Sequence, residues 1–243
     1  MPGIFSYDYN AFPFTVFTAS HILMIVLLAA VSGILFILRK RLRQVDAWVR
    51  GMMFFLLFVL ELLYHIWLFN NGQWDISFTL PLHLCSISLI LCLVLLATKS
   101  NAIFQVVYFI GIVGALMAIL TPELFLGFPH FRYFQFFITH NLIIWTCLYY
   151  VFVHQFKPTG NGMLLSFLFL NISACAAFWA NQITGGNYMF VAYKPENASL
   201  LDYLGPYPFY ILSLEGAALL LFFILLAPFK MNNSKKERME DMS

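Results

Sequence analysis

The feature that most limits how this chain can fold is a series of seven apolar blocks, each of about twenty residues, the length with which an α-helix crosses the hydrocarbon core of a bilayer. Of the 243 residues, 62% are hydrophobic and 10% charged, whereas a soluble domain has roughly 45–50% apolar and about 25% charged residues. The sequence therefore predicts an all-α, polytopic transmembrane bundle. Its seven predicted spans are Thr15–Leu38, Trp48–Phe69, Thr79–Ala97, Ala102–Leu120, Phe134–Phe156, Met163–Ile183 and Tyr207–Phe229.

Basic residues beside the spans predict their orientation, because Lys and Arg are retained on the cytoplasmic side. Of the 13 Lys and Arg residues, eleven lie in or next to the connections after spans 1, 3 and 5 and in the tail. The other two, Arg132 and Lys194, follow spans 4 and 6. We therefore expect the N-terminus outside, the C-terminus in the cytoplasm, one transmembrane domain over residues 1–230 and a solvated polar tail over 231–243.

Several classes of function are disfavoured by composition. The net charge of +2 is small and scattered, so no nucleic-acid partner is expected. No span interior contains Lys, which removes the attachment point for a retinal Schiff base. His and Cys residues do not form i,i+3 or i,i+4 pairs, so no metal site is assigned and no cofactor is expected.

Polar side chains inside the spans gather in their outer halves. Such groups are costly in a bilayer and usually face the bundle interior. With about 1.5 Å of rise per residue, Glu61 and Glu215 lie roughly 12 Å below the outer surface, and His65 and His83 roughly 6 Å. The asymmetry predicts a pocket open to the outer leaflet. Its expected supporting residues are Glu61, His65, His83, Asn141, Asn181, Gln182 and Glu215.

Cys85 is the most reactive candidate in this set. Its segment, TLPLHLCS, also contains His83, but two residues correspond to about 200° around a helix, so the two side chains do not face each other. His140 has the same predicted depth, roughly 9 Å, and a neighbouring imidazole can hold a cysteine as the nucleophilic thiolate. The alternative is that these residues only join helices through hydrogen bonds.

Four sequence strings at these positions resemble a known family. The bacterial YwaF family of membrane proteins has similar strings, and it is itself similar to the animal transmembrane protein 164 family. The resemblance extends from about span 1 through span 7. The strings are LPLHLCSISLIL (Leu80–Leu91), GFPHFRYFQFFITHN (Gly127–Asn141), GGNYMF (Gly185–Phe190) and LLDYLGPYPFYILSLE (Leu200–Glu215).

The resemblance implies acyltransferase chemistry on phospholipids in a cell membrane, the bacterial plasma membrane if the YwaF resemblance holds. Cys85 would be the nucleophile that forms an acyl thioester and His140 its base. The expected partners are a phospholipid or lysophospholipid and the bilayer, with Arg132 and Lys194 as candidate headgroup ligands. An acyl hydrolase uses the same residues. The non-enzymatic alternative is a proton-responsive transporter or a lipid-binding receptor. The sequence does not predict the acyl donor, the acceptor or the oligomeric state.

Overall fold

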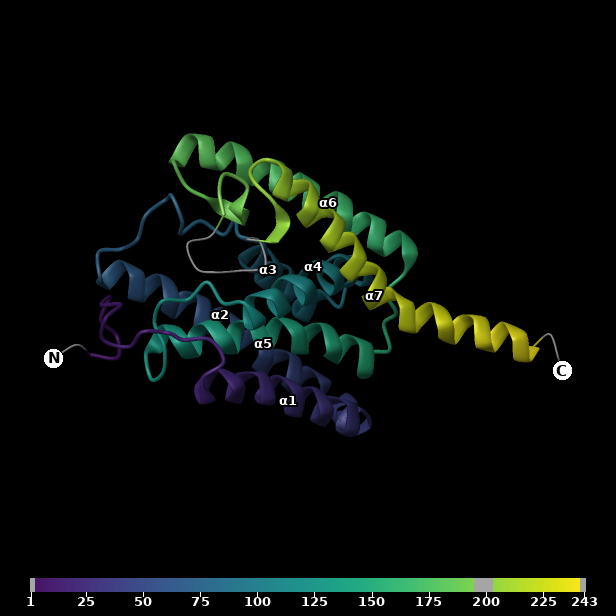
Figure 1. Ribbon diagram of the computed structural model, residues 1–243. Helices are drawn as coiled ribbons and strands as arrows, with labels where there is room; N and C mark the ends of the chain where they lie inside the picture. Colours follow the sequence, from purple (N-terminus) through teal and green to yellow (C-terminus); the bar gives the residue numbers. More distant parts are fainter. Residues whose placement is uncertain (1–2, 195–202, 241–243) are drawn as a thin grey trace.

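The computed structural model describes residues 3–194 and 203–240, with side chains up to Lys230. Seven α-helices pack side by side into one bundle (Figure 1), in agreement with the predicted all-α class. A short 3₁₀ helix, η1 (Tyr188–Phe190), follows the sixth. The α-helices are α1 (Ala19–Gln44), α2 (Asp46–Asn70), α3 (Leu84–Thr98), α4 (Asn101–Leu120), α5 (Phe131–Phe152), α6 (Gly160–Thr184) and α7 (Phe209–Glu240).

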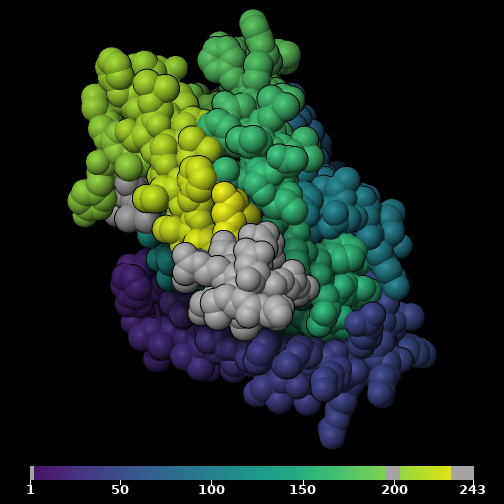
Figure 2. All heavy atoms as spheres, turned by 90° about the vertical axis from the view of Figure 1, so that its right-hand side faces the viewer, coloured from purple at the N-terminus to yellow at the C-terminus, as the bar shows by residue number. Residues whose placement is uncertain are grey.

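Five of these helices are long and apolar enough to cross a membrane: α1, α2, α4, α6 and α7 up to Lys230. α5, with 22 residues, is not among these five and is buried among α1, α2, α3 and α4. A helix enclosed by protein needs no apolar surface toward lipid. α4 and α5 thus form the centre of the bundle, with α1 and α2 on one side and α6 and α7 on the other (Figure 2).

α3 is shorter than predicted, with 15 residues. We expected the third span to begin at Thr79, but the helix begins at Leu84. Pro81 disfavours the helical conformation of Leu80, and the amide of Thr79 instead closes a turn onto the carbonyl of Asp75 at 2.9 Å. The late start brings Cys85 into the first turn of α3.

α1 and α5 are joined by side chains of α5 that donate hydrogen bonds to backbone carbonyls of α1. The acceptors recur every four residues, so all lie on one face of α1. Side-chain hydrogen bonds of this kind contribute about 0.6 kcal/mol each in membrane bundles. The pairs are Tyr133 Oη to Ser20 (2.6 Å), Asn141 Nδ2 to Met24 (3.4 Å) and Trp145 Nε1 to Leu28 (3.2 Å).

One end of the bundle, the basic end, is held together by Asp46. Its Oδ1 accepts hydrogen bonds from Tyr149 Oη (2.9 Å) and His154 Nε2 (2.7 Å), both in or next to the end of α5. Its Oδ2 accepts from Arg50 Nε (3.0 Å) and Lys99 Nζ (2.7 Å). One carboxylate therefore joins α2, the connection between α3 and α4, and the end of α5.

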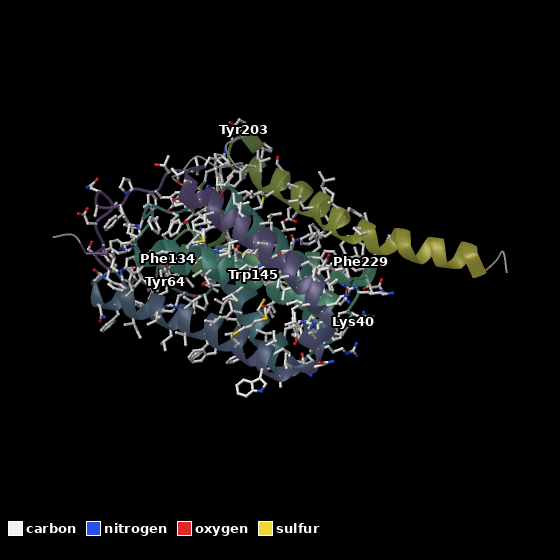
Figure 3. The ribbon with its side chains drawn as sticks, turned by 90° about the horizontal axis from the view of Figure 1, so that it is seen from below. Lys40, Tyr64, Phe134, Trp145, Tyr203 and Phe229 are labelled. Atoms are coloured by element: carbon white, nitrogen blue, oxygen red, sulfur yellow. The ribbon has the colours of Figure 1, made fainter. Side chains whose placement is uncertain are left out.

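α7 extends past the other helices at the basic end (Figure 1). The helix continues to Glu240, so residues 231–240 of the expected polar tail are helical. Figure 3 places Lys40 and Phe229 at this end, with Tyr64 and Phe134 at the opposite end and Trp145 between them.

The opposite end, the cap end, is covered by two pairs of connecting segments. In the first, the N-terminal segment pairs with the connection between α4 and α5: Phe14 N donates to Phe125 O at 3.0 Å, and Gly127 N donates to Phe12 O at 2.6 Å. In the second, residues 185–193 pack on residues 75–83. Tyr188 is fully buried there, and its Oη donates to Ile76 O at 2.6 Å.

Candidate functional site

The central interface of the bundle is made by α3, α4 and α5 in successive layers. In one layer, Cys147 Sγ of α5 lies 3.5 Å from the carbonyl of Val107 in α4 and interacts with Cys92 of α3. In the next layer toward the cap end, Gly111 of α4 brings the two neighbouring helices close. A Cβ on Gly111 would be 3.2 Å from Ile143 of α5 and 3.7 Å from Ser88 of α3.

The register of this interface is constant. From the first layer to the second, α3 and α5 each move back four residues while α4 moves forward four, as expected for two helices antiparallel to the third. A further step of three residues reaches Cys85 on α3, Gly114 on α4 and His140 on α5. The position of Cys85 in this layer is supported by a contact, because a Cβ on Gly114 would be 4.0 Å from Cys85 Sγ. The position of His140 is inferred from the register alone, so the proximity of Cys85 and His140 stays a prediction.

Cys85 is the second residue of α3. The first amides of a helix have no acceptor within the helix, and together with the helix dipole they favour negative charge nearby. The residue before the helix, His83, makes no side-chain capping bond. Within the described part of the chain, Cys85 is half-buried, unbridged and without a hydrogen-bond partner.

The hydrogen bond of His140 determines which of its nitrogens can act as a base. Its Nδ1 lies 2.7 Å from the carbonyl of Phe136, and a carbonyl can only accept, so Nδ1 carries the proton. Nε2 is then the unprotonated nitrogen, and among the described residues it has no hydrogen-bond partner. The Phe136 ring, with its centroid 4.3 Å from that of the imidazole, fixes the ring orientation.

His83 belongs to the second cap instead of the helix interior. Its Nδ1 accepts a hydrogen bond from the amide of Met189 at 3.4 Å, and its ring packs on Tyr188. Asn181 holds the same cap: its Oδ1 accepts from Tyr188 N at 2.7 Å, and its Nδ2 donates to Tyr188 O at 3.1 Å. Met189 and Phe190 both have positive φ, near 56° and 55°, a costly conformation for residues other than glycine.

Arg132 and Lys194, the two candidate headgroup ligands, lie in different caps. The guanidinium of Arg132 is 4.3 Å above the ring of Tyr64 and donates a hydrogen bond to Gln135. Lys194 Nζ lies 5.7 Å from the ring centre of Tyr210. The two basic side chains are therefore placed against different aromatic rings.

The other expected pocket residues are divided among separate places. Glu61 and His65 pair on α2, with 3.5 Å between Oε1 and Nε2. Glu215 Oε2 accepts a hydrogen bond from Asn171 of α6 at 3.0 Å. Asn141 faces α1, its Oδ1 is buried without a partner among the described residues, and Gln182 is exposed. The described residues contain no group of three or more His, Cys, Asp and Glu side chains that could hold a metal ion.

Sequence reasoning missed the two glycines of α4 and the carboxylate of Asp46. Gly111 and Gly114 stand three residues apart in the string GIVG, and small residues at helical spacing allow close helix packing in membranes. That signal was readable in the sequence. The role of Asp46 could not be predicted, because its four partners come from three different segments.

The chain matches one known family over most of its length. The chain matches the TMEM164 family over residues 16–226, which includes all seven helices apart from the end of α7, and Cys85, Gly114 and His140. No curated protein and no solved structure matches the chain. Because the family match extends over most of its length, the chain belongs to the TMEM164 family.

Proposed function

We propose that this integral membrane protein transfers fatty acyl groups between membrane lipids, with Cys85 as nucleophile and His140 as base. The observation that supports the proposal is the register of α3, α4 and α5: Cys85 lies against Gly114, and the same register predicts His140 at that level. The tautomer of His140 adds support, because Nε2 is the nitrogen left to accept a proton. The role of each residue matches what the resemblance to the transmembrane protein 164 family implied.

In the first half-reaction, Cys85 Sγ attacks the ester carbonyl of a donor lipid and His140 Nε2 accepts the thiol proton. The ester C–O bond breaks, the departing lysolipid oxygen takes that proton, and an acyl thioester remains. In the second half, a lipid hydroxyl attacks the thioester and gives its proton to His140. The C–S bond breaks, and the thiolate is reprotonated. With water in place of the hydroxyl, the same steps give hydrolysis.

The first turn of α3 would stabilise the negative charge that develops on the carbonyl oxygen. The helix begins at Leu84, so the amides of Leu84, Cys85 and Ser86 precede the first helical acceptor pairing, which joins Ile87 N to His83 O at 3.0 Å. Preorganised amide donors of this kind lower the barrier to acyl transfer. The second cap, bound to His83 through Met189 at 3.4 Å, lies beside this turn and would limit the access of water to it.

The proposal includes the predicted topology of seven spans, with the cap end outside and the basic end in the cytoplasm. Lys40, Arg50 and Lys99 all lie at the basic end, which supports this orientation through the retention of positive charge on the cytoplasmic side. α5 would cross as a protein-enclosed span and α3 as a short apolar one. Membership of the bacterial YwaF branch and a bacterial plasma membrane remain part of this proposal.

The alternative, a proton-responsive transporter or receptor, required Glu61, His65, His83 and Glu215 to form one network. These groups are partnered separately, on α2, in the second cap and on α6. Acyl transfer is therefore the function that the arrangement favours.

Reconstitution of the protein in liposomes with labelled-acyl phospholipids and lysophospholipids tests the proposal. We expect Cys85→Ala to lower transfer by about a thousandfold or more, and His140→Ala to lower it by about 10²- to 10⁴-fold, the usual contribution of a general base. Cys175→Ala, which changes an exposed cysteine on α6, is the matched control and should retain transfer. Wild-type turnover in Cys85→Ala would contradict the thioester mechanism.

A further inference from the structure

A groove of about 310 Å³ lies between α2 and α3, at the lower end of the size range of ligand pockets. The two helices are antiparallel, so the groove follows their axes. It extends from His65 and Pro81 at the cap end to Phe58 and Leu93 nearer the basic end. On α2 this is seven residues, or about 10 Å. An opening along a membrane-spanning helix pair has the direction of a lipid chain in the bilayer.

The groove is polar at one end and apolar along the rest. Its polar side chains are Glu61 and His65, whereas Phe58, Ile90 and Leu93 make the inner part apolar. His65 Nδ1 accepts a hydrogen bond from Trp74 Nε1 at 3.3 Å, so Nε2 carries the proton that faces Glu61. Among the described residues, Glu61 Oε2 has no hydrogen-bond partner, and it can accept one from a ligand.

Two residues that line the groove flank Cys85 in the sequence. Pro81 and Leu89, four residues before and four after Cys85, both line it, whereas Cys85 does not. Leu89 is about 40° from Cys85 around α3. The groove and the layer of Cys85 and Gly114 therefore lie on neighbouring faces of α3.

We propose that this groove binds the single hydrocarbon chain of a lysolipid, whose free hydroxyl donates a hydrogen bond to Glu61. The volume suits one chain better than two, and the polar end of the groove lies toward the cap end, where a headgroup would lie. A carboxylate accepts hydrogen bonds from hydroxyls but repels another carboxylate, so a fatty acid is disfavoured. The inference rests on the proposed function, in which this lysolipid is the acyl acceptor.

The test uses the Cys85→Ala protein in phosphatidylcholine nanodiscs, so that binding is measured without turnover. A lysophosphatidylcholine with a diazirine in its acyl chain is photo-crosslinked, and the labelled peptides are identified by mass spectrometry. Ile90→Trp fills the groove. Ile172→Trp is the matched control, because Ile90 and Ile172 are 43% and 60% exposed and Ile172 lies on α6 outside the groove.

We expect labelling of α2 and α3 at the groove, reduced about tenfold by Ile90→Trp and unchanged by Ile172→Trp, since a filled groove excludes the apolar contacts of the chain. Labelling spread evenly over the lipid-facing helices, or unaffected by Ile90→Trp, would overturn the inference. Equal labelling of the groove by a diazirine fatty acid would overturn the hydroxyl assignment. If the groove is labelled but the wild-type protein forms no acyl adduct, the proposed function is contradicted and the binding of a lysolipid in the groove is not.

Discussion

Single polar side chains join several segments at each end of this bundle. At the basic end, the carboxylate of Asp46 satisfies four donors from three segments. At the cap end, His130 bonds through both ring nitrogens: Nδ1 accepts from the amide of Arg132 at 3.0 Å, and Nε2 lies 2.9 Å from the carbonyl of Ser6. Each is a residue whose removal has a specific structural consequence.

Replacing Asp46 with Ala should lower the free energy of unfolding by about 2–3 kcal/mol, because hydrogen bonds to charged groups are lost and their cationic partners are left uncompensated. The measurement is thermal unfolding of the detergent-solubilised protein. Asp8→Ala, which removes an exposed carboxylate in the N-terminal segment, should leave the transition temperature nearly unchanged. Equal transition temperatures for the two variants would show that the Asp46 contacts do not stabilise the bundle.

His130 predicts a pH dependence of the first cap. Burial lowers the pKa of His130, and only the neutral ring can accept the Arg132 amide on Nδ1 while donating to Ser6. Below about pH 6.5 the unfolded chain binds the proton more readily than the folded protein, so stability is full above that pH and is lost as the pH falls toward the lowered pKa.

Hydrogen exchange of residues 3–14, corrected for the intrinsic pH effect, should therefore speed up as the pH falls from about 7 to 5. His130→Asn keeps a capping acceptor for the Arg132 amide but cannot titrate, so its exchange should not depend on pH. Identical pH profiles in the two proteins would contradict the role of His130.

Two glycines, which have no side chain, allow neighbouring segments to come close together at and near the candidate site. Gly114 permits Cys85 of α3 to approach α4, and Gly186 permits residues 185–193 to approach the connection between α2 and α3. A Cβ on Gly186 would lie only 2.8 Å from the carbonyl carbon of Ser77 and closer still to its oxygen. Gly114 thus packs against side chains of α3 and Gly186 against backbone, and hydrophobic periodicity reveals neither contact.

Gly114→Leu should abolish acyl transfer while the bundle stays folded. The new side chain would have to lie where Leu84 and Cys85 now pack, with its Cβ 3.2 Å from Leu84 Cδ2, so α3 must move away from α4 and overpacking costs about 1–3 kcal/mol. Gly51→Leu, on α2 with open space around it, is the control for both expression and transfer. Retained transfer in Gly114→Leu would exclude a reaction at this layer.

Gly186→Ala should detach the second cap from the connection between α2 and α3, because neither backbone can yield without breaking the contacts of Tyr188. Limited proteolysis should then cut within residues 185–193 faster than in the wild type. Gly160→Ala, at the open first position of α6, should be cut at the wild-type rate. Equal cleavage of all three proteins would show that this close contact does not hold the cap.

At the level of the whole molecule, the sequence predicted the all-helical bundle and the approximate position of every helix, because each apolar block is long. The depths of residues predicted from helical rise were less accurate, because two helices begin at other residues than expected. α3 begins five residues late at Leu84 and α5 three residues early at Phe131, so Cys85 and His140 are not equally far from their helix starts. Their predicted common level rests instead on the register of α3 and α5 against α4. We expected seven polar residues to line one pocket. Whether they face one another depends on how each helix is rotated about its axis, which depth alone does not determine.

The topology predicts where reporters become accessible. Fusions after Lys99 or Lys157 should report a cytoplasmic location, and one within residues 73–76 an external location, since α2 and α3 meet at the cap end. An external reporter after Lys99 would reverse the proposed orientation.

An acyl thioester on Cys85 can be detected by intact-mass measurement of the protein after incubation with phospholipid, before and after treatment with hydroxylamine. We predict an adduct of acyl-chain mass on the wild type and on Cys175→Ala, removed by hydroxylamine in both and absent from Cys85→Ala. An adduct that persists in Cys85→Ala, or a wild type that carries none while transferring acyl groups, would contradict the thioester mechanism.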